Sequence, residues 1–170
     1  CKINEETCDH VLQCQDPVVK SKRTERIVEF RKELEKLETY PLLIKRLISV
    51  IQQWCGGHNI CTTFPLSDDY GMTILNRAFV VQAAVGIKHL FRGLLTWDII
   101  KVQEWYYEEH EHKRKNTVDR WSKSVVRFLL TMTADSWQTR CEIVNEKDAS
   151  EAEKYTRRLA YDLALKLQSA

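Results

Sequence analysis

The sequence predicts an all-α protein, an irregular bundle of about five to seven helices that follows a short Cys/His-rich segment. Apolar residues recur at steps of three and four over most of the chain, the period of a helix with one buried face. Only 5 glycines and 3 prolines interrupt 170 residues, and no run alternates as a half-buried strand would. We expect residues 1–18 to form a separate Cys-rich segment and residues 19–170 one helical domain.

Two helices open the helical domain. The first is expected over residues 21–38, where dense charges leave one apolar stripe made of Ile27, Phe30, Leu34 and Leu37. Pro41 suits the first turn of a second helix over residues 42–54, because the N–H that proline lacks is not needed there. We expect the two helices to pack as an antiparallel pair.

Glycine, proline and aspartate mark residues 55–71 as a long loop, and loops of this length are usually functional or disordered. Helical spacing resumes over residues 72–85 and breaks at Gly86. A short helical piece over residues 87–95 then ends near Gly93.

The carboxy-terminal part predicts three more helices. Thr96 is a suitable N-cap for residues 97–112. The apolar face of that helix is expected to comprise Trp97, Ile100, Val102, Trp105 and Tyr106. Residues 117–145 carry apolar side chains on more than one face and predict a central helix. Ser150 and Glu153 form a capping box, which predicts a separate terminal helix.

The charge balance restricts the classes of partner. A net charge of +2 is far from the basic excess typical of a dedicated nucleic-acid binder, so contact with RNA or DNA would need a local patch. The candidate phosphate contacts are Lys20, Lys22, Arg23 and Arg26, and Arg31 and Lys32 continue this basic run along the same predicted helix. Interleaved glutamates favour the alternative, an exposed face of i,i+4 ion pairs. The apolar runs are far shorter than the roughly 20 residues that cross a bilayer, so we expect no membrane partner.

Three of the six cysteines fall in the first 14 residues, where their spacing suits a metal. His10 and Cys14 stand four apart and would share one face of a helical turn capped by Thr7. Cys1 can fold back as a third ligand of a tetrahedral zinc ion. Cys8 is available as the fourth, although a cysteine just upstream of residue 1 would have the better geometry.

This spacing resembles a known motif. Cys1, Glu6-Thr7, His10 and Cys14 resemble the second half of the C-x-x-C, E-T-x-x-H, x-x-x-C zinc knuckle that follows the polymerase domain in non-LTR-type retroelement reverse-transcriptase proteins. Further resembling positions follow in order up to residue 145, namely Thr39, Pro41, Trp54, Gln82, Gly86, Phe91, Gly93, Trp97, Gln103, Tyr106, Tyr107, Trp121, Trp137 and Arg140. The Tyr-x-Asp-Asp polymerase hairpin is not represented.

The resemblance implies a tail domain that carries a partial zinc knuckle over residues 1–18 and binds nucleic acid or scaffolds a complex. Its zinc would be structural, and its protein partners would be upstream domains of the same polyprotein, in the nucleus or cytoplasm. We expect no enzyme, because the sequence has no phosphate-cradling glycine loop, nucleophile turn or H-E-x-x-H spacing.

Two alternatives stay open. The chain would instead be a secreted helical signalling or effector protein if its six cysteines formed three disulfides, although no Asn-x-Ser/Thr acceptor occurs. Cys55-x-x-His58-x-x-Cys61 offers a second metal site, and a glycine turn with two ordinary thiols or a disulfide is the simpler interpretation.

Overall fold

The structure is a computed structural model that describes residues 7–58, 60, 69–110 and 117–168, with the backbone alone at residues 8, 147, 148 and 157–168. Across these residues it contains six α-helices, one 3₁₀-helix and no strand. The predicted fold class and number of helices are therefore confirmed. None of the described helices combines the length and the apolar character needed to span a membrane.

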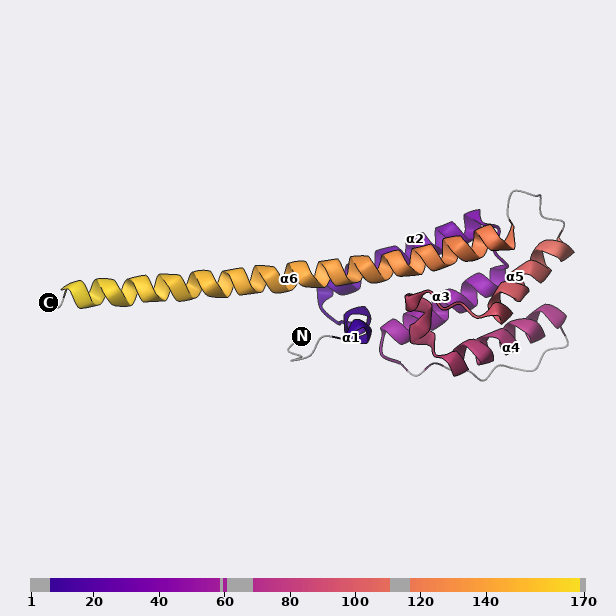
Figure 1. Cartoon of the computed structure of the whole chain (residues 1–170), viewed down its shortest axis with the longest axis horizontal. Helices are drawn as coiled ribbons and strands as arrows, with labels where there is room; N and C mark the ends of the chain where they lie inside the picture. The colour runs from indigo at the N-terminus through magenta and orange to yellow at the C-terminus, as the bar shows by residue number, and fades with distance from the viewer. Residues whose placement is uncertain (1–6, 59, 61–68, 111–116, 169–170) are drawn as a thin grey trace.

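The helices form a bundle beside the first half of the last one (Figure 1). In chain order they are α1 (Cys8–Gln13), α2 (Pro17–Lys36), α3 (Pro41–Cys55), α4 (Tyr70–Val85), η1 (Ile87–Arg92), α5 (Trp97–Glu109) and α6 (Val118–Gln168). α2 and α3 run in opposite directions, as predicted. The largest fully buried side chains are Trp121, Phe30, Phe79 and Phe91. The second half of α6 extends away from all the other helices.

α2 begins four residues earlier than predicted, at Pro17. The carboxylate of Asp16 accepts a hydrogen bond of 3.1 Å from the N–H of Val18, so Asp16 caps the helix and Pro17 occupies the first turn. The predicted loop lies between α3 and α4, although residues 59 and 61–68 are outside the described part of the chain.

α6 is one continuous helix of 51 residues, so the predicted break before a separate terminal helix is wrong. The capping box of Ser150 and Glu153 lies inside α6. No glycine or proline occurs between Val118 and Gln168, and glutamate, lysine and alanine around the expected break all favour helix. At 1.5 Å per residue the helix is about 76 Å long.

The predicted apolar face of α5 is also partly wrong. The helix buries Ile99, Val102, Gln103 and Tyr107, whereas Trp97 is 60% exposed. A polar glutamine therefore occupies a fully buried position that a search for apolar spacing passes over.

Two buried glutamines close turns of the backbone. The side-chain oxygen of Gln82 accepts from the N–H of Thr96 at 2.9 Å, and its amide donates to the carbonyl of Leu94 at 3.3 Å. The side chain of Gln103 likewise accepts from the N–H of Tyr40 at 2.9 Å and donates to the carbonyl of Glu38 at 3.3 Å. Each glutamine thus satisfies backbone groups that a helix terminus leaves unpaired.

The turn between α2 and α3 is held from two further helices. The hydroxyl of Tyr107 on α5 donates to the carbonyl of Leu37. The indole N–H of Trp121 on α6 donates to the hydroxyl of Thr39 at 2.8 Å, and both side chains are buried. Several positions that carry the resemblance to retroelement tails are therefore buried groups that fix turns.

Gly71 lies in the first turn of α4 against an aromatic ring. A Cβ at this position would lie 2.8 Å from Cζ3 of Trp105 and 3.0 Å from the hydroxyl of Tyr40. We predict that Gly71→Ala lowers the free energy of unfolding by about 1 to 3 kcal/mol through overpacking, measured by urea denaturation. The double variant Gly71→Ala/Trp105→Leu should then lose less stability than the sum of the two single changes. Strict additivity would contradict this contact.

Candidate zinc and nucleic-acid-contact site

Two of the predicted metal ligands have described side chains, His10 on α1 and Cys14 directly after it. The hydroxyl of Thr7 accepts a hydrogen bond of 3.2 Å from the N–H of His10, which confirms Thr7 as the cap of this turn. Val11, Leu12 and Cys14 are buried. The short helix is therefore packed on the bundle by its apolar side.

A buried arginine holds the end of α1. Arg23 of α2 is 5% exposed, and its Nη1 donates to the carbonyl of Leu12 at 2.6 Å and to the carbonyl of Cys14 at 3.0 Å. Hydrogen bonds from a charged donor are stronger than neutral ones. Arg23, one of the predicted phosphate contacts, thus joins α1 to α2 beneath the surface.

Other side chains join α1 to α3 and η1. The amide of Gln13 donates to the carbonyl of Trp54 at 3.1 Å, and the amide of Gln15 donates to the carbonyl of Cys55 at 3.5 Å. The carboxylate of Asp9 lies 3.7 Å from Lys88 and 3.5 Å from Arg92. α1 is consequently fixed to three other elements.

The donor chemistry of α1 fits zinc. Nε2 of His10 is buried and has no hydrogen-bond partner among the described residues, and Cys14 carries a free, buried thiol. Imidazole nitrogen and thiolate sulfur are the donors of structural zinc sites. Cys1 and the side chain of Cys8 lie outside the described residues, within which no three His, Cys, Asp or Glu side chains form a metal-sized cluster.

The two described residues of the second candidate metal site, Cys55 and His58, lie in the core and at the surface respectively. Cys55 is 3% exposed and belongs to the hydrophobic core, whereas His58 is exposed. Burial raises the pKa of the Cys55 thiol to about 11. Cys61 lies outside the described residues. Cys55 packs among the apolar side chains of the core, whereas His58 is exposed, so Cys55 is a core residue in this fold.

The raised pKa of Cys55 predicts a loss of stability in alkali. Between pH 9 and 11 the unfolded thiol releases its proton while the folded thiol keeps it, so the free energy of unfolding falls as pH rises. Cys55 alone should account for about 2 kcal/mol between pH 8 and pH 11. Burial also raises the pKa of Tyr107 to about 12, which adds to the loss above pH 10. Urea denaturation under reducing conditions should show a smaller alkaline loss in Cys55→Ala, and an equal loss in both proteins would contradict the assignment.

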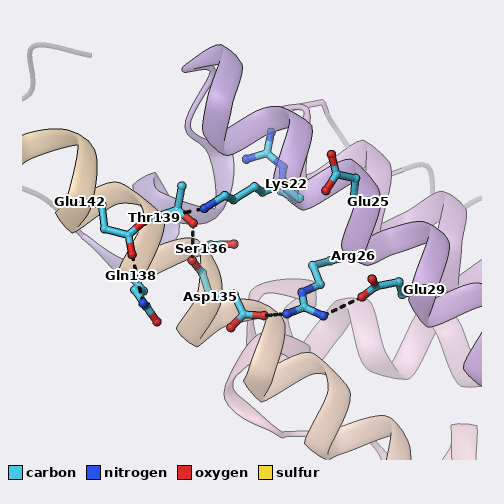
Figure 2. A pocket seen from close by; sticks show the side chains of 10 residues that line it. Lys22, Glu25, Arg26, Glu29, Asp135, Ser136, Gln138, Thr139 and Glu142 are labelled. Carbon is cyan, nitrogen blue, oxygen red and sulfur yellow. Dashed lines mark hydrogen bonds and ion pairs between the residues drawn. The ribbon is translucent and has the colours of Figure 1, made fainter.

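Lys22 and Arg26 lie in a groove of about 390 Å³ between α2 and α6 (Figure 2). Arg26 is placed between two carboxylates, 2.6 Å from Glu29 and 2.6 Å from Asp135. The hydrogen bond to Glu29 and the attraction of Asp135 raise the pKa of Arg26. Lys22 lies 3.8 Å from Glu142. These cations are therefore already matched by carboxylates.

Exposed cations gather on the opposite side of α2. Helical geometry places Lys20 about 160° from Lys22 and almost in line with Arg31, three turns further on. Arg31 lines a hollow of about 550 Å³ together with Lys45 of α3, and Glu35 is the only acidic residue among those that line it. Lys20, Arg31 and Lys45 are all exposed. We call these three residues the basic row.

Lys20 and Arg31 both belong to the basic run predicted from the sequence, but the sequence does not show that they form a row with Lys45. The interval of 11 residues between Lys20 and Arg31 is visible in the sequence as three helical turns. Lys45 joins them only because α3 packs beside α2, which no local pattern shows.

Comparison with known protein families, curated proteins and solved structures finds no match to this chain. The function of the chain has therefore to be inferred from three features of its structure, which are α1, the groove and the basic row. Of these, α1 offers zinc donors and the basic row offers exposed cations. The groove offers cations that are already paired.

Proposed function

We propose that the chain is a non-catalytic accessory domain, the helical tail of a retroelement reverse-transcriptase-like protein, which holds a structural zinc ion and contacts RNA or DNA. The observation that carries this proposal is His10, whose buried Nε2 has no hydrogen-bond partner among the described residues and which lies four positions from the free thiol of Cys14. A buried polar atom without a partner is costly, and a bound ion relieves that cost.

In this proposal His10 and Cys14 hold zinc, with Cys1 and Cys8 as further ligands. Bound zinc supplies a fixed tetrahedral cross-link and takes no part in a reaction. Because Arg23, Gln13 and Gln15 join α1 to α2 and α3, such a cross-link would anchor the chain that precedes α1 to the bundle. The zinc would thus set the position of the tail relative to upstream domains.

The placement of the resembling residues supports the proposal. Gln82, Gln103, Tyr107 and Trp121 are buried and hold turns. Such groups specify a fold, because each leaves backbone groups unpaired when it is lost. Their order along the chain is therefore what a shared helical tail fold would require.

The proposed nucleic-acid contact is the basic row. Lys20 and Arg31 are three helical turns apart, a distance of about 16 Å, and Lys45 extends the row onto α3. Exposed lysine and arginine bind phosphates without sequence preference, and each neutralised phosphate adds to the salt dependence of affinity. The paired residues Lys22 and Arg26 would contribute less, because Glu142, Glu29 and Asp135 compete with phosphate.

Salt-dependent binding of single-stranded RNA and DNA tests the contact. The triple variant Lys20→Glu/Arg31→Glu/Lys45→Glu should bind more weakly, and the slope of log affinity against log salt should fall by roughly 2 to 3. Lys22→Gln, a change in the paired groove, is the matched control and should change the slope by less than about 1. Equal effects of the triple variant and the control would contradict the assignment of the row.

The free thiols of the described cysteines argue against the secreted, disulfide-bonded alternative. Cys14, Cys55 and Cys141 carry free thiols in the structure. This supports a chain that works in the reducing interior of the cell, in the nucleus or cytoplasm. Titration of thiols after unfolding without reductant decides the matter, since three disulfides would leave no reactive thiol.

A further inference from the structure

One side of α6 is left uncovered by the other described helices, and two hollows lie along it. The first, of about 530 Å³, lies between α6 and the segment that joins η1 to α5, and Leu95 and Val126 are among the residues that line it. The second, of about 320 Å³, lies between α6 and α1 and is lined in part by Val11 and Trp137. Leu130 lines both, so the two hollows adjoin. We call them together the α6 cleft.

The floor of the α6 cleft is apolar and partly open. Leu130 and Trp137 are 45% and 44% exposed, and because they stand seven residues apart, about two helical turns, both point to the same side of α6. Gly93 allows the backbone before α5 to lie directly on α6, because a Cβ there would lie 3.2 Å from Cγ1 of Val126. Large apolar side chains gathered on one face, unlike single scattered ones, mark an interaction surface.

The rim of the α6 cleft is positive. Lys123 and Arg127 line it and are exposed, and neither hollow is lined by an aspartate or glutamate of the described chain. Within the described part of the chain Arg127 has no ion-pair partner, and Lys123 has one, Asp119 at 2.7 Å. The side chains of that pair are 75% and 71% exposed, so water screens their attraction. The cleft therefore offers a negatively charged partner two cations that carboxylates of the described chain hold weakly or not at all.

The carboxylates on the neighbouring turns of α6 face the other way. Asp135 and Glu142 lie in the groove with α2, where Asp135 is 2.6 Å from Arg26 and Glu142 is 3.8 Å from Lys22 (Figure 2). Helical geometry places these two carboxylates about 140° to 160° from Trp137 around the axis of α6. They therefore leave the positive rim of the cleft unmatched.

The shape of the cleft suits a helix. Its lining runs along α6 from Ser122 to Trp137, which is about 22 Å or four helical turns. An extended peptide would have to pair its backbone with the edge of a sheet, and the described residues contain no strand. A helix satisfies its own backbone groups and needs only an apolar face to fill the cleft.

We propose that the α6 cleft binds an acidic amphipathic helix of another protein. The apolar face of that helix packs on Leu130 and Trp137, and its carboxylates lie beside Lys123 and Arg127. A second copy of this chain is a poorer occupant, because a two-fold axis would set the positive rim against itself. The contact is independent of the proposed zinc site and nucleic-acid contact, because it uses neither His10 nor the basic row.

Two labelled synthetic peptides, mixed with the full chain and followed by fluorescence anisotropy, test the charge of the partner. Both form helices of about 15 to 18 residues with leucines along one face, and the remaining positions carry glutamate in one peptide and lysine in the other. The acidic peptide should bind at least roughly tenfold more tightly, and Lys123→Glu/Arg127→Glu should reverse the order. Lys32→Glu/Lys36→Glu, which changes two exposed lysines of α2, is the matched control and should keep it. An acidic peptide that does not bind at about 1 mM, or an order that Lys123→Glu/Arg127→Glu leaves unchanged, would overturn the proposal.

Loss of the apolar floor tests the place of binding. Leu130→Ser/Trp137→Ser should weaken the acidic peptide at least roughly tenfold and leave the helical circular dichroism unchanged. Val28→Ser, at a side chain that is 49% exposed on α2, is the control and should bind as the unchanged chain does. Equal binding by all three proteins would overturn the assignment of the cleft.

Other occupants of the cleft give different results with the same variants. Light scattering that shows a dimer of the full chain, and a monomer of Leu130→Ser/Trp137→Ser, would assign the cleft to a second copy and overturn the proposal. Sedimentation of the full chain with phosphatidylserine vesicles, lost in Leu130→Ser/Trp137→Ser, would assign it to a membrane surface and likewise overturn the proposal. We expect a chain that stays monomeric and does not sediment with the vesicles.

Discussion

Replacing Trp121 with alanine is expected to lower the free energy of unfolding by about 3 to 5 kcal/mol. Trp121 is fully buried at the start of α6. Its indole N–H also donates to Thr39 at 2.8 Å, so the change leaves both a large cavity and a buried hydroxyl without a partner. Urea denaturation followed by circular dichroism measures the loss.

Two further variants separate the contributions of side-chain burial and of the hydrogen bond to this loss of stability. Trp121→Phe keeps most of the apolar volume and removes the hydrogen bond to Thr39, so its loss should be about 1 to 3 kcal/mol. Trp97→Ala removes the same type of side chain at a position that is 60% exposed, and should cost less than about 1 kcal/mol. Similar losses in Trp121→Ala and Trp97→Ala would contradict the arrangement of the core.

Replacing Arg23 with methionine is expected to cost about 2 to 4 kcal/mol and to weaken the attachment of α1 to α2. Methionine fills a similar space but leaves the carbonyls of Leu12 and Cys14 without their donor. Hydrogen exchange should therefore become faster throughout α1 and the start of α2, while α5 stays protected. That local signature distinguishes the loss of an anchor from a general loss of stability.

Arg26→Met is the control for Arg23→Met. The side chain of Arg26 is 40% exposed, and exposed ion pairs such as those with Glu29 and Asp135 are worth less than about 1 kcal/mol. If Arg26→Met were as damaging as Arg23→Met, the buried hydrogen bonds of Arg23 would not be the anchor of α1.

The fold class and most helix boundaries could be predicted from the sequence, because they follow from local rules. Gly86 and Gly93 end helical pieces and Thr7 caps α1, as their chemistry predicts, whereas Thr96 precedes α5 but makes no cap hydrogen bond with its side chain. The capping box of Ser150 and Glu153 gave a wrong prediction of a helix start, because capping residues permit a helix start but do not force one. Without a glycine or proline nearby, the helix simply continues through them.

The roles of the polar residues could not be predicted, because they depend on contacts between helices distant in sequence. Arg23 belongs to a run of surface charges by composition, yet it is buried by its contact with the end of α1. Gln82 and Gln103 interrupt apolar stripes, yet each is fully buried by the turn that it closes. Lys45 enters the basic row only through the packing of α3 on α2.

The zinc content of the purified full chain tests whether His10 and Cys14 hold a structural zinc ion. We expect about one zinc ion per chain, lost in His10→Ala and in Cys14→Ser and retained in His58→Ala, whose imidazole is exposed. Circular dichroism of each variant should remain helical, so that loss of metal is not loss of fold. A chain that contains no zinc when purified in its presence, or one whose zinc survives His10→Ala, would contradict the account.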